Sequence, residues 1–388
     1  MKLFTFIFGM VILCSCTNET NRKDIYSVKG SNHFYTINTK TINPSSRCIR
    51  YFNNDKGKWL FYENTNFNEL IIYNLPQGDI LKRTKFEKKG PNGIGSLKGF
   101  HVHNFDSIFL VSGTYIHQFY LTDTSGIVKK NYKLKPIDDK EIPFCVKQLW
   151  SNDCINESNI KNNTINLSTY YPFVGMETTK KINKKLPNEV IDFSYDLGEN
   201  KIVNTSNYPN FKIETNNKLI FHNRCLLDED RYIYSFRYLD NIYIQNNDSN
   251  YTIILCKSKY RTNPIEKGDS YAPIIQQMAH SVKNPHYLNI IHDKYRDCTY
   301  RYFYPGVELK DNEDPQKMMR NRKRFSIMIL DENLDIVGET MMPDNTYNPF
   351  MSFVAEDGLY IALHCDHPKY NPDSLMFERI DLKPVNHE

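Results

Sequence analysis

A short pattern that recurs along this chain constrains its fold more than any other feature. An acidic residue and a small or polar residue precede alternating aliphatic and aromatic residues, in copies that begin at Asp106, Asp240 and Asp357. A looser copy begins at Gly57. Acidic and small residues favour tight turns, and the alternation that follows them is typical of a buried strand. The pattern therefore predicts a fold built from repeated turn–strand units.

A second pattern joins an apolar strand to an Ile-led return strand through a polar turn, which predicts β-hairpins over residues 73–81, 119–128 and 328–337. The first two hairpins are offset by 47 residues, from Leu81 to Val128, and a four-stranded propeller blade occupies about 40–50 residues. We therefore predict an all-β fold, a single-domain β-propeller of six four-stranded blades, with seven as the alternative count. The predicted units are residues 51–88, 99–135, 143–205, 218–260, 285–342 and 350–383.

The composition agrees with a β-rich fold. The chain has 388 residues, 40% of them hydrophobic, and includes 27 Tyr and 23 Phe. Aromatic side chains fit the half-buried surface of a sheet. One segment has a helical pattern, Ala272 to Val282, and we expect it to form a short helix between two blades.

The first seventeen residues have the form of a secretory signal. Lys2 precedes an apolar run from Leu3 to Leu13, which is too short to remain as a membrane span. Small residues then lead into Cys16 in a pattern that resembles the lipobox of bacterial lipoproteins, so Cys16 is the expected lipidation site; a buried first strand or helix is the alternative. We expect residues 1–15 to be the lipoprotein signal peptide, 16–30 the lipidated Cys and a polar tether, and 31–388 the propeller.

A loop with the sequence Lys-Gly-Pro-Asn-Gly-Ile-Gly at residues 89–95 leads into Phe100-His101-Val102. Together with the lipobox and the strand repeats, it resembles the uncharacterised six-bladed β-propeller lipoproteins of Bacteroidota that carry domain of unknown function 4221. The resemblance covers nearly the whole mature chain and implies a propeller fold and an envelope location. It carries no known catalytic residues, so it assigns none to this chain.

Charge and cysteine content exclude several classes of function. A formal net charge of +4 over this length predicts no nucleic-acid partner. Seven cysteines remain beyond the signal and Cys16, an odd and scattered set that does not resemble a disulfide framework or a zinc site. We expect buried thiols and no cofactor. The seven are Cys48, Cys145, Cys154, Cys225, Cys256, Cys298 and Cys365.

Three histidines form a candidate metal site. His101 and His103 are two residues apart and share a face if their segment is a regular strand, and His117 lies on the next strand of the same unit. Three imidazoles suit a divalent metal such as zinc, although no acidic partner for them is evident. The segment His364-Cys365-Asp366-His367 is a second, weaker cluster, because strand alternation would divide its ligands between two faces.

Four residues of one predicted strand form a candidate binding surface. Tyr300, Tyr302 and Tyr304 lie on one face and Arg301 on the other. Aromatic side chains can stack on sugar rings or anchor a partner. A propeller sheet, however, packs against its neighbours on both faces, which favours a core role for these tyrosines.

These features support two hypotheses of different classes. The first is an envelope-anchored lipoprotein, attached to the membrane through its lipid, whose non-catalytic propeller binds an envelope protein or a glycan. The second is a polysaccharide-active hydrolase or lyase on the same scaffold, which is an analogy at the level of fold. We expect the outer membrane as the location. Only Glu19 is acidic among the residues just after Cys16, which favours a periplasm-facing position over surface exposure.

Overall fold

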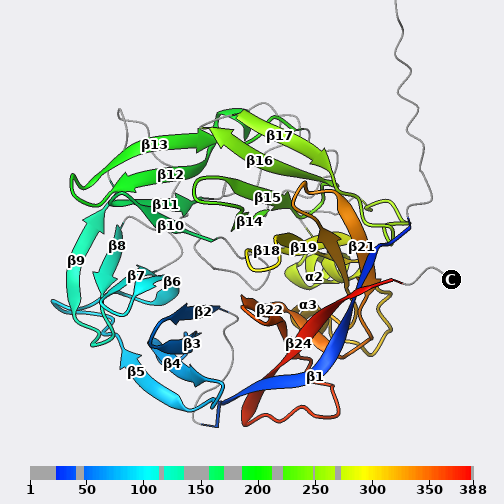
Figure 1. Cartoon of the computed structure of the whole chain (residues 1–388), viewed down its shortest axis with the longest axis horizontal. Coiled ribbons are helices and arrows are strands. Elements are labelled where there is room, and N and C mark those ends of the chain that lie inside the picture. Colours follow the sequence, from blue (N-terminus) through cyan, green and yellow to red (C-terminus); the bar gives the residue numbers. More distant parts are fainter. Residues whose placement is uncertain are drawn as a thin grey trace, which may run out of the picture.

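Six four-stranded antiparallel sheets are arranged as the blades of a ring in the computed structural model of this chain (Figure 1). The structure describes residues 23–40, 48–112, 118–134, 157–169, 186–211, 222–247, 250–266 and 272–385. The predicted β-propeller with six four-stranded blades is confirmed. In each blade the first strand lies nearest the centre of the ring.

The first three blades follow one another along the chain. Blade 1 contains β2 (Ile49–Asn54), β3 (Gly57–Asn64), β4 (Glu69–Leu75) and β5 (Ile80–Lys85). Blade 2 contains β6 (Leu97–Asn104), β7 (Ser107–Ser112), β8 (Gln118–Thr122) and β9 (Val128–Lys133). Blade 3 contains β10 (Asn159–Lys161), β11 (Thr164–Ser168), β12 (Val190–Asp196) and β13 (Lys201–Asn207), with the 3-10 turn η1 (Leu186–Asn188) before β12.

The other three blades complete the ring. Blade 4 contains β14 (His222–Leu226), β15 (Tyr232–Phe236), β16 (Asn241–Asn247) and β17 (Asn250–Leu255). Blade 5 contains β18 (His286–Asp293), β19 (Cys298–Tyr304), β20 (Ser326–Leu330) and β21 (Ile336–Met341). Blade 6 contains β22 (Tyr347–Ala355), β23 (Gly358–Leu363), β24 (Ser374–Pro384) and β1 (Tyr26–Asn38).

The ring is closed by the N-terminal strand. β1 forms the outer strand of blade 6 by pairing antiparallel with β24, from Tyr26 opposite Pro384 to Asn38 opposite Ser374. The last five residues of the expected tether, 26–30, are therefore part of this strand rather than a linker. Joining the two ends of the chain in one sheet closes the ring and holds it together.

Six hydrophobic clusters lie between the blades, one at each junction. At the junction of blades 5 and 6, Tyr302 and Ile327 pack with Leu359. Other clusters join blades 6 and 1, 1 and 2, 2 and 3, and 4 and 5. Among the described residues the cluster between blades 3 and 4 is the smallest, and it includes Tyr208 and Tyr234. Burial of apolar area between blades is thus the main force that holds the ring together.

Alternation along the second strand of a blade explains this arrangement. In β19, Tyr300, Tyr302 and Tyr304 face blade 6, whereas Phe303 packs in the cluster shared with blade 4. A strand with neighbours on both faces is buried along its whole length, and every residue of β19 is buried. The predicted turn–strand copies at Gly57, Asp106 and Asp357 correspond to second strands of the same kind, β3, β7 and β23.

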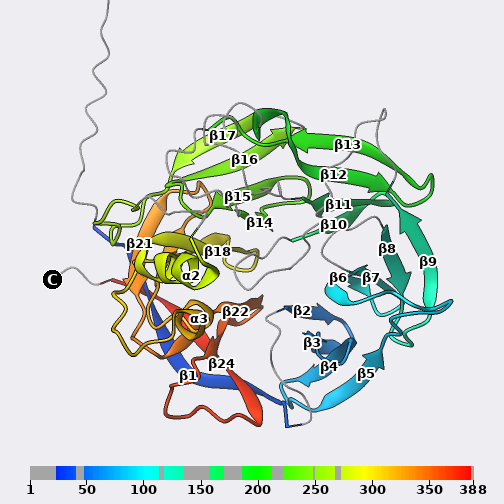
Figure 2. The same cartoon turned by 180° about the vertical axis from the view of Figure 1, so that it is seen from behind.

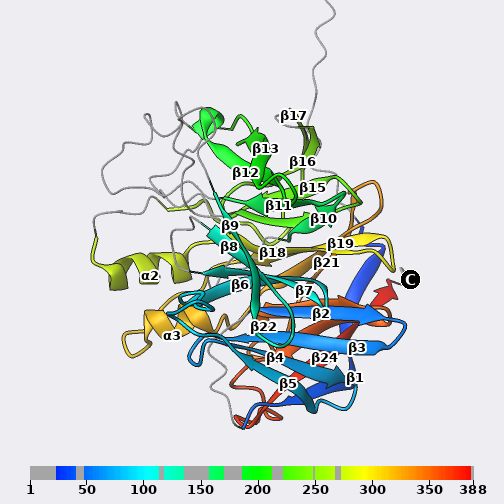
Figure 3. The same ribbon diagram turned by 90° about the vertical axis from the view of Figure 1, so that its left-hand side faces the viewer.

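Two helices lie on one face of the ring. α2 (Ile274–Lys283) connects β17 to β18, and α3 (Pro315–Arg320) connects β19 to β20. They lie side by side (Figure 2), and both project from the same side of the molecule (Figure 3). The predicted helix over 272–282 is confirmed, but its apolar residues do not all face the core, because Val282 is buried and Ile274 is 66% exposed. No helix among the described residues has the length and apolar content needed to cross a membrane.

Candidate functional site

A cavity of about 640 Å³ lies at the centre of the ring. Its walls are the first strands of five blades, β2, β10, β14, β18 and β22, together with the turns that follow β14 and β18. Those turns lie at the ends of the strands away from α2 and α3 (Figure 3). The cavity therefore opens towards the face opposite the helices, and its size is that of a typical small-ligand site.

The charged groups of the cavity fall into two classes. Arg224 is paired with Asp192 at 2.8 Å, and Lys161 is paired with Glu229 at 3.1 Å and with Asp230 at 2.7 Å. Two other lining cations, Arg50 of β2 and Lys294 of the turn after β18, have no acidic partner within 4 Å among the described residues. The cavity therefore has positive charge that the described part of the protein does not neutralise directly.

Aromatic side chains line the wall between blades 1 and 6. Tyr51 stacks on Phe353 with a centroid distance of 5.6 Å, and its hydroxyl donates to the Glu356 carboxylate at 2.5 Å. Tyr295, in the turn after β18, is 36% exposed and lines the same cavity. The Tyr295 ring is partly exposed and has Lys294 Nζ 5.2 Å from its centroid, whereas the Tyr51 ring is held by its neighbours.

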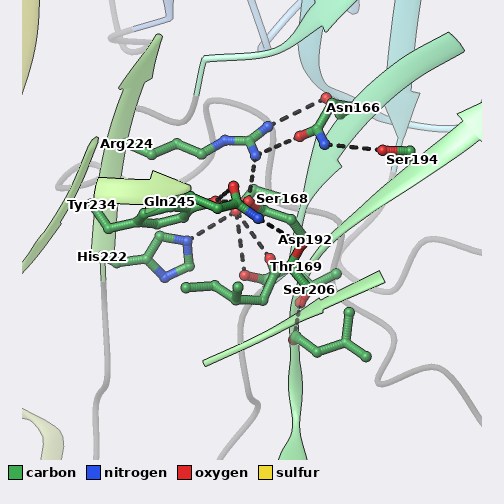
Figure 4. Close-up of polar contacts among 12 residues, drawn as sticks. Asn166, Ser168, Thr169, Asp192, Ser194, Ser206, His222, Arg224, Tyr234 and Gln245 are labelled. Carbon is green, nitrogen blue, oxygen red and sulfur yellow. Dashed lines mark hydrogen bonds and ion pairs between the residues drawn. The ribbon is translucent and has the colours of Figure 1, made fainter. Parts of the chain in front are cut away.

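A buried polar network supports the opposite wall, between blades 3 and 4 (Figure 4). Arg224 of β14 and Asp192 of β12 are both fully buried. The Arg224 guanidinium also donates to Asn166 Oδ1 at 2.6 Å, and Tyr234 donates to the Asp192 carboxylate. Burial raises the pKa of Asp192, and the nearby Arg224 guanidinium and the Ser168 hydroxyl oppose that rise.

The same network contains a serine–histidine pair. Ser168 Oγ lies 2.9 Å from His222 Nε2, a distance expected of a nucleophile and its base. The two side chains, however, are 0% and 2% exposed, which leaves no route for a substrate in this structure. We interpret the pair as part of the packing that replaces apolar contacts where the inter-blade hydrophobic cluster is smallest.

The pKa values of two titratable groups of the cavity are both lowered, with different effects on their charge. Burial alone would raise the pKa of Asp228, but the N–H groups of Asp230 and Arg231 and the Arg231 guanidinium bring it below the usual value. Burial lowers the pKa of His292, against the pull of nearby carboxylates such as Asp297. At neutral pH the site therefore contains an ionised Asp228 and a neutral His292.

Comparison with known families identifies the chain. Its sequence matches the family "Domain of unknown function (DUF4221)" over residues 26–341, which is most of the chain. This protein belongs to the DUF4221 family. The resemblance inferred from the sequence is thereby confirmed. No curated protein matches the sequence.

Two solved structures support the fold assignment for this DUF4221 protein. A DUF4221 member from Bacteroides vulgatus is 22% identical, with a TM-score of 0.80, and the match covers 94% of this chain and 100% of that one. A putative exported protein from Bacteroides fragilis is 12% identical, with a TM-score of 0.53, and the match covers 93% of this chain and 98% of that one. At these identities the likeness concerns the fold alone.

The aromatic candidates of the DUF4221 chain lie in the core. Tyr300, Tyr302 and Tyr304 are at most 1% exposed, in the cluster between blades 5 and 6. Arg301 is fully buried on the other face, where it donates to Ser235 Oγ and to four backbone carbonyls of blade 4 and its flanks. This placement agrees with the core interpretation, and it shows no surface on this strand for stacking on a sugar.

The histidine candidates are only partly described. His101 lies half-buried on β6, and burial together with Arg50 lowers its pKa to about 3. His103 is exposed, and a register shift between Val102 and Asn104 breaks the alternation on which the shared face depended. His117, like Cys16, lies outside the described residues, so the three-histidine site stays a prediction.

The second cluster of candidate ligands lies in a turn after β23. One ligand atom each from His364, Cys365 and Asp366 lies within 4.8 Å of the others. His364 Nδ1, however, accepts the backbone N–H of Asp366 at 3.1 Å, and burial raises the pKa of the Cys365 thiol. These contacts oppose metal binding, because a metal ligand must offer a free lone pair or a thiolate.

The described cysteines are thiols and not disulfides, as expected. Cys48, Cys225, Cys256 and Cys298 are buried, Cys365 is partly exposed, and none of these five forms a disulfide. The other two mature cysteines lie outside the described residues.

The sequence did not point to the cavity. The turn–strand copies mark the apolar strands inside the blades, whereas the cavity is lined by first strands. These first strands mix polar with apolar residues, as in Ile-Arg-Tyr-Phe-Asn-Asn of β2 and His-Asn-Arg-Cys-Leu of β14. A polar strand placed before an apolar one in each unit is the signal that would have found them.

Proposed function

We propose that this DUF4221 protein is an envelope-anchored lipoprotein whose propeller binds a protein or glycan partner in its central cavity, without catalysis. The observation that carries the proposal is the cavity of about 640 Å³, which joins a partly exposed Tyr295 ring to two cations, Arg50 and Lys294, that have no acidic partner among the described residues. Aromatic and polar groups that converge in a concave site are typical of ligand binding. A propeller suits this role because its rigid blades hold the lining residues in place.

The anchor follows from the sequence. A lipidated Cys16 would carry the acyl chains, and two or more such chains make membrane attachment stable. The proposed location is the outer membrane, in a periplasm-facing position. β1 begins at Tyr26, ten residues after Cys16, so the anchor would hold the propeller close to the bilayer.

A polysaccharide hydrolase or lyase remains the second candidate, because carboxylates and His292 line the same cavity. A glycosidase needs one carboxyl group with a raised pKa to act as the acid. The pKa of Asp228 is lowered instead, and the Glu229 carboxylate is paired with Lys161. Among the described residues, Glu157 is the acidic group of the cavity that has no cationic partner. A Glu157→Gln variant with unchanged glycan turnover would exclude it from catalysis.

Site-specific photo-crosslinking tests the binding proposal. A benzophenone amino acid replaces Tyr295 at the cavity or, as the control, Leu81, which is 48% exposed on the outer strand β5. The full chain is expressed in its native envelope and irradiated. We expect a discrete adduct at position 295 that is absent at position 81. Equal labelling at both positions, or none at position 295, would contradict the proposal.

A further inference from the structure

Arg50 is the most distinctive charged group of the central cavity. It lies at the second position of β2 and is partly buried. Its neighbours Ile49 and Tyr51 pack in the cluster shared with blade 6, so alternation turns Arg50 towards blade 2. His101 of β6 lies on that side, and Arg50 contributes to keeping this imidazole neutral. The guanidinium therefore lies between the first strands of two blades, at the wall of the cavity.

The contacts of Arg50 differ from those of the other cavity arginine. Arg224 has Asp192 at 2.8 Å and Asn166 at 2.6 Å. Among the described residues the Arg50 guanidinium has no hydrogen-bond partner within 3.5 Å and no carboxylate within 4 Å, although its backbone pairs with Phe61 of β3. A partly buried charge without a counter-ion is unfavourable, because it loses hydration without gaining a partner. Five N–H donors in a planar fork thus remain available for an anion that enters the cavity.

Other groups of the cavity suit a sugar ring rather than a simple ion. Tyr295 offers a partly exposed aromatic ring, with Lys294 Nζ 5.2 Å from its centroid. The Glu157 carboxylate accepts one backbone N–H, from Leu226 at 2.9 Å, and keeps further acceptor capacity for hydroxyl groups. Asn159 also lines the cavity. The negative charge of Glu157 disfavours an anionic group beside it, so we expect hydroxyl groups of the ligand at Glu157 and an anionic group at Arg50.

From these contacts we propose that the cavity binds an acidic saccharide and that Arg50 pairs with the carboxylate or sulfate group of that ligand. The inference rests on the proposed binding function and specifies its ligand class. Lys294, which also has no acidic partner among the described residues, adds positive charge at the mouth. A bidentate Arg–carboxylate pair in a partly desolvated site is stronger than a neutral hydrogen bond.

The test compares ligands that differ only in charge. The purified full chain, held in detergent, is titrated with tetragalacturonate and with its methyl ester, and with a chondroitin sulfate tetrasaccharide and its desulfated form. Thermal shift and calorimetry report binding. We expect at least one acidic oligosaccharide to bind, its less charged counterpart to bind at least tenfold more weakly, and the affinity to fall with added salt.

Two matched variants assign the effect to Arg50. Arg50→Gln should weaken binding of the acidic ligand by about 10-fold to 100-fold and leave the ligand-free protein at least as stable. Arg324→Gln, at an exposed arginine paired with Asp344 outside the cavity, should change nothing. Equal affinity for charged and neutral forms, full binding by Arg50→Gln, or no binding of any acidic ligand would overturn the inference. A crosslink at position 295 together with any of these results would leave the proposed function standing and reject only the ligand class.

Discussion

At the scale of single residues, three arginines show how local partners decide a role. Arg301 is fully buried and donates to Ser235 Oγ and to backbone carbonyls that include Asp240 and Cys256, so it joins blade 5 to blade 4. Arg224 is also buried and joins blade 4 to blade 3 through Asp192. Arg50 has no such partner among the described residues and lines the cavity. The first two are structural, and the third is available to a ligand.

We expect Asp192→Asn to destabilise the protein by about 3–5 kcal/mol, because it leaves the buried Arg224 without its counter-ion. Urea unfolding measures the change. The control is Asp228→Asn, at a partly exposed pair with Arg231, which should cost less than about 1 kcal/mol. Similar losses in the two variants would contradict a structural role for the Arg224–Asp192 pair.

At the scale of elements, the central strands were predictable and the closing strand was not. β7 and β23 follow their predicted acidic turns, and β4 and β5 form a predicted hairpin. These features depend on neighbours in the sequence. β1 pairs with β24, more than 300 residues away, and residues 26–30 are polar enough to be taken for a tether. β1 has a pairing partner only because closure of the ring places β24 beside it.

A glycine beside the closing strand provides a test of ring closure. Gly78, in the turn between β4 and β5, has φ +78°, and a Cβ there would lie 1.7 Å from the Thr36 carbonyl oxygen of β1. We expect Gly78→Ala to cost more than about 2 kcal/mol, from backbone strain and displacement of β1. Gly90 has φ +95°, but a Cβ there would meet only the Glu87 Oε2 atom, at an ordinary contact distance of 3.5 Å, so Gly90→Ala should cost only about 1 kcal/mol. Equal effects of the two substitutions on the unfolding free energy would show that close packing of β1 against this turn does not contribute to stability.

At the scale of the whole molecule, closure of the ring creates the cavity. Its lining begins at Ile49 and ends at Val354, and no two neighbouring blades contain all of it. The inter-blade clusters rigidify the walls, so the cavity is a property of the closed ring rather than of any blade. The helices α2 and α3 occupy the other face (Figure 3). The two faces therefore differ in structure, and the cavity face is the one proposed to meet the ligand.

The proposed anchor is tested on the whole protein in cells. Cys16→Ser should abolish incorporation of an alkyne-labelled fatty acid and release the protein from the membrane fraction, because the acyl chains supply the attachment. Cys14→Ser should keep both the label and the membrane fraction, since Cys14 would be removed with the proposed signal peptide. Retention of label in the Cys16→Ser protein would show that Cys16 is not the lipidation site.

Sequence reasoning and structure agree most closely where local chemistry decides the outcome. Turn residues, strand alternation and the spacing of repeats determined the all-β class, the six blades and the short helix before β18, because each depends on residues close together in the chain. The burial of Tyr300, Tyr302 and Tyr304 also follows from sheets that pack on both faces. The tertiary structure alone decided the closing role of β1, the Arg224–Asp192 pair and the isolation of Arg50. These features depend on contacts between residues that are far apart in the sequence, and the sequence of one chain does not show which distant strands become neighbours.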